Sequence, residues 1–479
     1  LRLYRMAWLV AGVAVVVALL TLQPVDPAEE PRIPVVFDGE AALELSDRLE
    51  AGAPERAPGT EGGRRGAEWV RQELSRGPGA ENRVQVQDFS ARSDGRLVDM
   101  QNIYLANPGS GGADGGILVV APRDTPSGVV AGSSSSALLV RQARLWAASA
   151  HRRPILFVST DGSTVGNAGI RWFLSRFSDF TISAAIVLDG PGEQTGDDLH
   201  IWADGRSSET ALSLASWAED SVERTGESVV AYPGLWTQLV TRAIPQTFGD
   251  QGPMVSAGIP AVTISGRPDS PPQAGVTVDG ELLENAGVAV ADLIASLDET
   301  RDPPAPAVEV EVGGQILGPT LARAILLILA LPVLVAGADV VSRMRRAGVP
   351  RVPGLLGLGR RALPFAVLAA VAYGWALVGM FPPSAAGAPP LPGDMSFGAT
   401  SGLGVAVAIG IAIGVFAVMR SRVQVAAPAS EAGVAAVALS VLLLVAWVLE
   451  PFSLILLLPA AHAALLATAV TRRWQVAAL

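Results

Sequence analysis

The sequence predicts an α/β domain with a mostly parallel central sheet flanked by helices, followed by an all-α transmembrane bundle. Three short apolar runs, Ile117–Val120, Ile155–Ser159 and Ala185–Leu188, are separated by segments of helical periodicity. That alternation is typical of strand–helix–strand units. From about Leu321 the composition changes, and long apolar runs follow one another to the end, which predicts membrane helices.

The overall composition excludes several classes of protein. The chain has 479 residues, of which 50% are hydrophobic and only 17% charged. It has no cysteine, so disulfides, thiolate zinc sites and thiol nucleophiles are excluded. A net charge of −10 argues against a nucleic-acid partner. All 35 basic residues are Arg, a usage that points to a GC-rich, bacterial genome.

The N-terminal segment, residues 1–25, is predicted to be a transmembrane anchor. Met6–Leu22 is an apolar run of 17 residues that follows Arg2 and Arg5. A signal peptide is the alternative, but its apolar core is usually shorter and ends at a small-x-small cleavage site. Since Gln23 and Pro24 follow instead, we expect an uncleaved anchor with a cytoplasmic N-terminus. Residues 26–36, rich in Pro and Glu, are predicted to be a linker.

Residues 37–300 are predicted to form the α/β domain. Apolar spacing predicts five helices, over Phe37–Leu49, Gly62–Ser75, Ala137–Ala150, Glu209–Glu223 and Leu282–Leu297. Further strands are expected over Val84–Phe89, Asp99–Ala106, residues 199–204 and Ala261–Ser265. The segment Tyr232–Phe248, which carries Trp236, is expected to line a cleft. Residues 301–320 are Pro-rich and predicted to be a second linker.

Polar residues end each of the three central strands. Arg123 and Asp124 follow the first, Asp161 the second and Asp189 the third. In parallel sheets, sites lie beyond the carboxyl ends of the strands. A functional site is therefore expected at this edge.

The order of elements resembles metallopeptidase family 28, the di-zinc aminopeptidases, over about residues 55–298. The opening Arg56-x-Pro58-Gly59-Thr60 and the closing Gly258-Ile259-Pro260 match the family frame. The resemblance implies two zinc ions held by His, Asp and Glu side chains, with a Glu as general base.

Most of the residues that the resemblance requires are replaced. Pro122 stands at the first His position, Gly132 at the bridging Asp, Ser163 and Thr164 at the Glu pair, and Gln251 at the last His; Asp189 and Asp124 remain. Pro and Gly offer no side-chain donor, and neutral oxygens are weak zinc ligands. No side chain at the base position can activate water. The sequence therefore predicts a pseudopeptidase with no catalytic residue and no cofactor.

Two alternatives concern ligands at the same edge. Asp124, Asp161, Asp189 and Asp250 could form a shifted site for a hard cation such as Ca²⁺, which prefers oxygen ligands. Ser133, Ser134, Ser135 and Ser136 precede a helical segment; they cap that helix, or they bind an anion such as a phosphorylated lipid headgroup at its N-terminus.

The C-terminal region, residues 321–471, is predicted to hold five further spans: Leu321–Val341, Ala362–Phe381, Leu403–Met419, Ala432–Leu449 and Phe452–Val470. Arg-rich loops alternate with loops that lack Arg, as the positive-inside rule requires for six spans. We therefore expect both termini in the cytoplasm, including the tail 472–479. The α/β domain would then lie outside a bacterial plasma membrane. Its acidic surface would be repelled by anionic lipid, so we expect it to stand off the membrane or to meet the membrane only at a local patch.

This layout resembles the anchor-attachment subunit of the GPI transamidase, which combines a family-28-like domain lacking zinc ligands with several spans. The resemblance implies a non-catalytic membrane scaffold for a peptide, lipid-linked or protein partner. The alternative is a divergent membrane-bound aminopeptidase with a rearranged metal site, in which zinc would be the cofactor. A transporter is disfavoured, because the spans lack a polar lining.

Overall fold

The computed structural model divides the chain into two compact units. The sheet unit lies within Pro24–Ile316, and the helical unit is formed by Leu1–Gln23 and residues from Leu317 onward. The structure describes residues 2–25, 36–377 and 428–469, with a few positions between 407 and 414; positions 78, 81–82, 94–95, 112–114, 131, 178–180, 194–197, 231–232 and 301–304 fall outside it.

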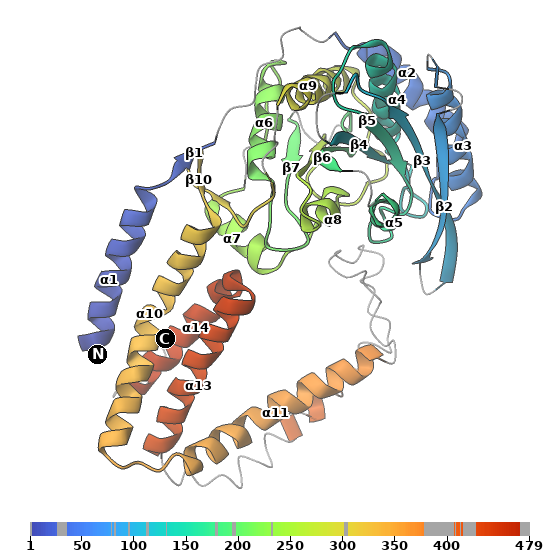
Figure 1. The fold of residues 1–479 in the computed structure, drawn as a ribbon. Helices are drawn as coiled ribbons and strands as arrows, with labels where there is room; N and C mark the ends of the chain where they lie inside the picture. Colours follow the sequence, from blue (N-terminus) through green and yellow to red (C-terminus); the bar gives the residue numbers. More distant parts are fainter. Residues whose placement is uncertain are drawn as a thin grey trace. The chain divides into compact units, whose positions relative to one another are not determined.

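A seven-stranded sheet forms the centre of the sheet unit, in the order β2-β3-β5-β4-β6-β8-β7 (Figure 1). The strands are β2 (Val84–Ser93), β3 (Arg96–Asn107), β4 (Gly116–Pro122), β5 (Ile155–Thr160), β6 (Ile182–Leu188), β7 (His200–Trp202) and β8 (Ala261–Ser265). The four strands β5, β4, β6 and β8 are parallel, whereas β2, β3 and β7 pair antiparallel. The predicted α/β class is confirmed, and the sheet is mixed.

The β2–β3 hairpin is longer than the alternating pattern indicated. Its register runs from Val84 opposite Leu105 to Ser93 opposite Arg96. The distal end is largely solvent-exposed, so no apolar alternation marks those residues. Hydrogen bonds between the two strands, rather than burial, define the outer half of this hairpin.

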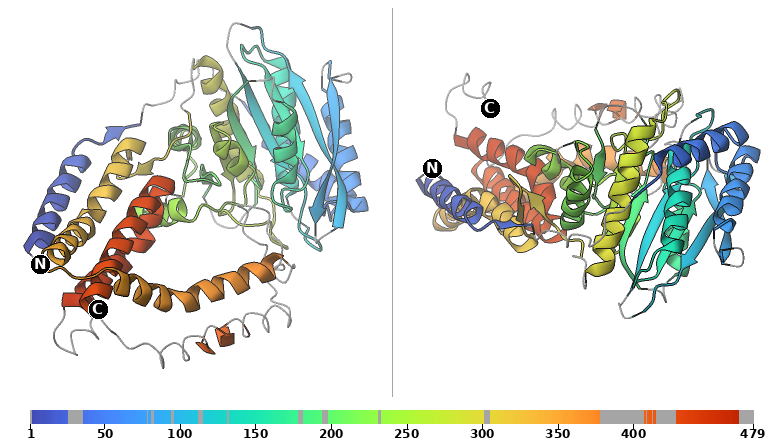
Figure 2. Two further views of the ribbon diagram at one scale, coloured as in Figure 1. Left: turned by 60° about the horizontal axis from the view of Figure 1, so that its bottom comes forward. Right: turned by 90° about the horizontal axis from the view of Figure 1, so that it is seen from above.

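Helices cover both faces of the sheet (Figure 2). One layer contains α2 (Gly39–Gly52), α3 (Glu61–Ser75), α4 (Ser133–Ala148), α6 (Leu212–Glu223) and α9 (Gly280–Glu299). The short helices α5 (Ala168–Arg176) and α8 (Gln251–Ser256) contact each other and the strands. Helix α5 lies in the segment of helical periodicity expected between the second and third apolar runs, whereas α8 was not predicted. Asp38, Thr60 and Asp279 cap α2, α3 and α9 through their side-chain oxygens.

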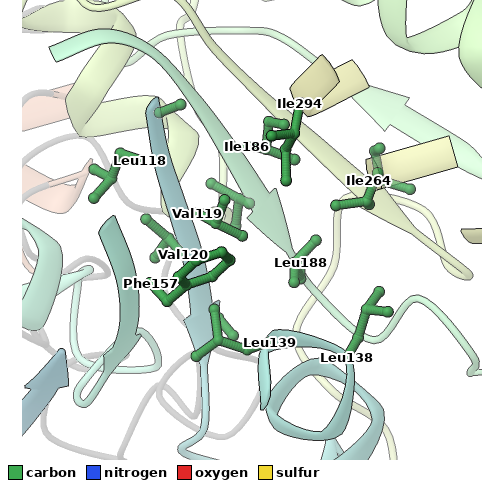
Figure 3. Close-up of a cluster of buried hydrophobic side chains, with 14 of the residues drawn as sticks. Leu118, Val119, Val120, Leu138, Leu139, Phe157, Ile186, Leu188, Ile264 and Ile294 are labelled. Carbon is green, nitrogen blue, oxygen red and sulfur yellow. The ribbon is translucent and has the colours of Figure 1, made fainter. Parts of the chain in front are cut away.

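The hydrophobic core joins β4, β5 and β6 to α4 and α9 (Figure 3). Val119, Phe157 and Ile186 are fully buried, as are Leu139 of α4 and Ile294 of α9. Both faces of the central strands are covered, which explains why these strands are continuous apolar runs rather than alternating patterns.

A small sheet and a short helix complete the sheet unit. The small sheet has the order β1-β10-β9, with β1 (Gln23–Pro24), β9 (Val310–Glu311) and β10 (Gln315–Leu317). Helix α7 (Leu235–Ala243) contacts β9.

The helical unit contains α1 (Arg2–Leu19), α10 (Pro319–Arg346), α11 (Val352–Leu377), α13 (Pro428–Leu449) and α14 (Leu454–Ala469), with the 3₁₀ turn η1 (Pro451–Ser453). Helix α10 contacts α1, α13 and α14. The Tyr4 hydroxyl of α1 lies 2.9 Å from His462 Nδ1 of α14. The predicted anchor therefore packs within the helical unit.

Three described helices are long and apolar enough to span a membrane, within Arg2–Leu19, Pro319–Arg346 and Ser430–Leu449. A bent pair in α11, with a 42° angle, raises the number to four. Six spans were predicted. The last one corresponds to a shorter apolar helix, Pro451–Leu465, and Leu403–Met419 lies largely outside the described residues.

Candidate functional site

The carboxyl ends of the parallel strands open onto one cleft. Its volume is about 40 Å³, room for about three water molecules. The lining residues come from the ends of β4, β5 and β6 and from two later loops: Pro122, Asp124, Ser163, Thr164, Gly166, Asn167, Asp189, Phe248, Asp250, Ser270, Pro271 and Pro272. A small cavity is thus present at the edge where the sequence predicts a site.

Asp124 is fully engaged by the turn after β5. Its carboxylate accepts the backbone N–H groups of Ser163 and Thr164, each at 2.9 Å. The Thr164 hydroxyl adds a third bond at 2.6 Å. Asp124 therefore holds the segment at which the resemblance requires a Glu pair.

Asp189 is paired with a buried arginine that the sequence reasoning did not find. Arg267, two residues beyond β8, donates from Nη2 to Asp189 and from Nε to Glu193 at 2.9 Å. Arg267 and Glu193 are each only 1% exposed, while Asp189 is 14% exposed. Glu193 also accepts a hydrogen bond from the backbone N–H of Gly132 at 2.8 Å. Gly132 is the residue that stands at the position of the bridging Asp.

The charges of this triad perturb one another. Burial raises the pKa of Asp189 and of Glu193, and the attraction of Arg267 opposes that rise. Burial alone would lower the pKa of Arg267, but the two carboxylates raise it. The positive charge of Arg267 therefore stabilises both carboxylates, and no external cation is required for this.

Asp250 is the N-cap residue of α8 and points into the cleft rather than toward the helix backbone. It accepts from the Thr160 hydroxyl at 2.7 Å, the Ser163 hydroxyl at 2.8 Å and the Asn167 amide at 2.7 Å. Burial raises its pKa to about 6, and these three donors limit the rise. Asn167 adopts φ of 58°, which directs its amide at this carboxylate.

Gln251, the residue at the last His position, does not line the cleft. Its amide donates to the Thr247 hydroxyl and accepts from the Thr263 hydroxyl, each at 2.8 Å. The side chain is fully buried. Pro122 and Ser163, at two other ligand positions, do line the cleft, and Gly132 has φ of 72° as the N-cap of α4.

Three of the four carboxylates of the predicted hard-cation site, Asp124, Asp189 and Asp250, line the cleft, but each is engaged by side chains or backbone of the protein. Asp161 pairs with Arg123 at 2.9 Å, away from the cleft lining. Asp124 and Asp250 each accept three hydrogen bonds. Within the described part of the chain, no three His, Cys, Asp or Glu side chains are grouped closely enough to hold a metal ion.

The serines at the start of α4 are buried within the fold. Ser133 to Ser136 form the first turn of this helix rather than a preceding loop, and each is at most 1% exposed. Ser135 accepts the N–H of Gly190 at 2.7 Å. The carboxylate of Glu193 already lies at this helix N-terminus, so the helix carries an internal anion there.

Trp236 is 74% exposed and does not line the cleft, whereas Phe248, at the end of the same predicted segment, does line it. Among the described residues of this segment, the expected cleft contact is therefore made by Phe248 and not by Trp236.

The sequence contained a signal for Arg267, since a polar residue follows each of the other parallel strands.

No family model and no curated protein matches this chain. Solved structures are similar to it at low identity. A glutaminyl cyclase from an Acidobacteriales bacterium is 21% identical, with a TM-score of 0.45 over 57% of this chain and 98% of that chain. LapB from Legionella pneumophila is 17% identical, with a TM-score of 0.44 over 55% and 73%. A leucine aminopeptidase precursor from Bacteroides thetaiotaomicron is 16% identical, with a TM-score of 0.42 over 55% and 98%. Similarity at this level concerns the fold alone.

Proposed function

We propose that this protein is a membrane-anchored, non-catalytic binding protein whose cleft is a degenerate peptidase site. The observation that carries the proposal is the pairing of Arg267 with both Asp189 and Glu193. A resident guanidinium takes the carboxylate that would otherwise bind a cation. The protein therefore needs no metal to stabilise its own acidic cleft.

The donors do not fit the two zinc ions that the resemblance implies. Zinc sites require three or four imidazole, thiolate or carboxylate donors within about 2.3 Å of the metal. Pro122 and Gly132 have no donor, Gln251 turns to Thr247 and Thr263, and Asp189 faces Arg267. Serine and threonine in place of the Glu pair leave no base to activate water.

The helical unit supports the membrane location. Its helices expose apolar side chains, among them Leu9, Val13, Phe365 and Val441, as lipid-facing helices do. The alternation of Arg-rich and Arg-free loops supports a topology with both termini cytoplasmic. The sheet unit would then face the outside of a bacterial plasma membrane and present its cleft to a peptide, lipid-linked or protein partner.

The cleft lining favours a small hydrogen-bond donor. Asp124, Asp189 and Asp250 line it, and of these Asp189 is paired with Arg267. A terminal ammonium group, with three N–H donors and one positive charge, matches this lining in size and charge. We therefore infer that the cleft holds the amino terminus of a peptide without cleaving it.

Metal content and hydrolysis together test the non-catalytic role. The full chain is purified in detergent, its metals are measured by mass spectrometry, and aminoacyl-nitroanilide hydrolysis is followed with added Zn²⁺. We expect no stoichiometric metal and no turnover. About two bound metals, with hydrolysis lost in Asp189→Ala, would instead establish the alternative, an aminopeptidase with a rearranged site.

A calorimetric titration tests the ligand. Trialanine with a free amino terminus is compared with its N-acetylated form. Because charge-assisted hydrogen bonds are worth roughly 1.5–3 kcal/mol, acetylation should weaken binding at least about tenfold. Equal binding of the two peptides would exclude the amino-terminal specificity.

A further inference from the structure

Helix α7 is oriented with its polar side chains toward the protein. Gln238 and Arg242, four residues apart, are 2% and 1% exposed. The Gln238 amide donates to the Glu311 carbonyl at 3.1 Å, and the Glu311 N–H donates to Gln238 Oε1 at 2.8 Å. Arg242 pairs with Asp204 and donates to the Glu309 carbonyl at 3.2 Å. These contacts fix the inner face of the helix.

The outer face of α7 is apolar and exposed. Leu235, Trp236 and Val240 are 44%, 74% and 45% exposed, and Ile244 just after the helix is 49% exposed. A helix on a water-facing surface shows the opposite arrangement, with the apolar stripe toward the core. We call these four residues the α7 face. Such a contiguous exposed patch marks an interaction surface.

The connections of α7 along the chain indicate the environment of its exposed face. Glu311 of β9, which holds Gln238, precedes Pro319 at the start of α10 by eight residues. An extended chain of that length reaches at most about 27 Å. Strand β1, in the same small sheet as β9, begins four residues after Leu19 at the end of α1. Through β9, the α7 face is thus connected by eight residues of chain to α10, a helix of membrane-spanning length.

We propose that the α7 face is an interfacial membrane contact that inserts into the outer leaflet. This inference rests on the membrane location proposed above. Trp is enriched at the level of the lipid headgroups, because its ring is apolar and its indole N–H group is polar. The helix carries a single charged residue, Arg242, and that residue is buried. Binding therefore depends on apolar area and not on anionic lipid.

The absence of cysteine from the chain permits a direct test with single-cysteine variants. The full chain is reconstituted in phosphatidylcholine vesicles after labelling Val240→Cys with an environment-sensitive fluorophore. Quenching by spin-labelled lipid and by aqueous iodide is then measured. Leu97→Cys on the β2–β3 hairpin is the aqueous control, since Leu97 is also an exposed apolar residue (72%). Val13→Cys, in α1, is the lipid control.

We expect lipid quenching at position 240 at least about twofold above that at position 97, with reduced iodide access. Adding phosphatidylglycerol should leave this ratio unchanged. Equal iodide access at positions 240 and 97 would overturn the proposal. Protection from iodide without lipid quenching would also overturn it, because another segment or a second copy would then cover the face. Absence of lipid quenching at position 13 would instead refute the membrane location itself.

Discussion

The cleft and the α7 face both depart from the usual distribution of side chains, in opposite directions. The cleft buries charged groups, among them Arg267, Glu193 and Asp250. The α7 face exposes apolar groups, among them Trp236 and Val240. In the cleft each of these charges has a partner within the sheet unit, whereas the α7 face remains exposed in the described part of the chain.

The charged groups of the cleft are stabilised by contacts within the sheet unit, whereas the apolar α7 face requires an environment other than water. Buried charges are tolerated only when they are paired and hydrogen-bonded, and the cleft meets that condition by itself. An exposed apolar face is stabilised only by leaving water. The cleft is therefore expected to govern the stability of the fold, and α7 its placement at the membrane.

The largest effect is expected from Arg267→Ala, which would leave Asp189 and Glu193 buried without their cation. Breaking a buried ion pair in this way costs about 3–5 kcal/mol. Urea unfolding of the full chain in detergent measures the loss. The control is Arg71→Ala, because the Arg71–Glu68 pair on α3 is 44% and 49% exposed and should contribute under about 1 kcal/mol. Similar losses in the two variants would contradict a self-contained cleft.

The next effect concerns pH. The folded-state pKa of Asp250 is about 6, above the usual value for Asp of about 3.9. Protonation therefore favours the folded state: the stabilisation is fully present below about pH 4 and is lost as the pH rises through about 6. Since two pKa units correspond to about 3 kcal/mol, the stability of Asp250→Asn should depend less on pH by up to that amount. Parallel pH curves for the two proteins would show that Asp250 does not titrate in this window.

A smaller effect is expected from Arg242→Ala on the inner face of α7. Its partner Asp204 is 24% exposed and can be rehydrated, so we expect a loss of about 2 kcal/mol. Thr241→Ala, on the same helix, is the matched control. In vesicles, Arg242→Ala should also loosen α7 and weaken the lipid quenching at position 240. A stable helix with unchanged quenching would mean that the inner contacts do not position the face.

The smallest change in stability is expected from Trp236→Ser. Because the side chain is exposed, the free energy of unfolding in detergent should change by less than about 0.5 kcal/mol. Lipid quenching of a label at position 240 should nevertheless fall, since Trp236 is the largest and most exposed side chain of the α7 face. A large loss of stability in detergent would show that Trp236 packs within the protein.

Local patterns predicted much of the fold. The central strands and the long helices were located from apolar spacing, because each is defined by residues close in sequence. Helix α8 and the outer half of the β2–β3 hairpin were missed. These elements bury few apolar residues in a regular pattern, so periodicity gives no signal for them.

The sequence by itself determined which donors a metal would lack, since Pro122 and Gly132 have no side-chain ligand in any conformation. It also determined where long apolar segments lie. Only the tertiary structure decided that Arg267 meets Asp189 and Glu193, that Gln251 turns away from the cleft, and that α7 presents its apolar side outward. These three features depend on contacts between residues 12 to 78 positions apart along the chain, and such contacts form only when the whole sheet unit is assembled.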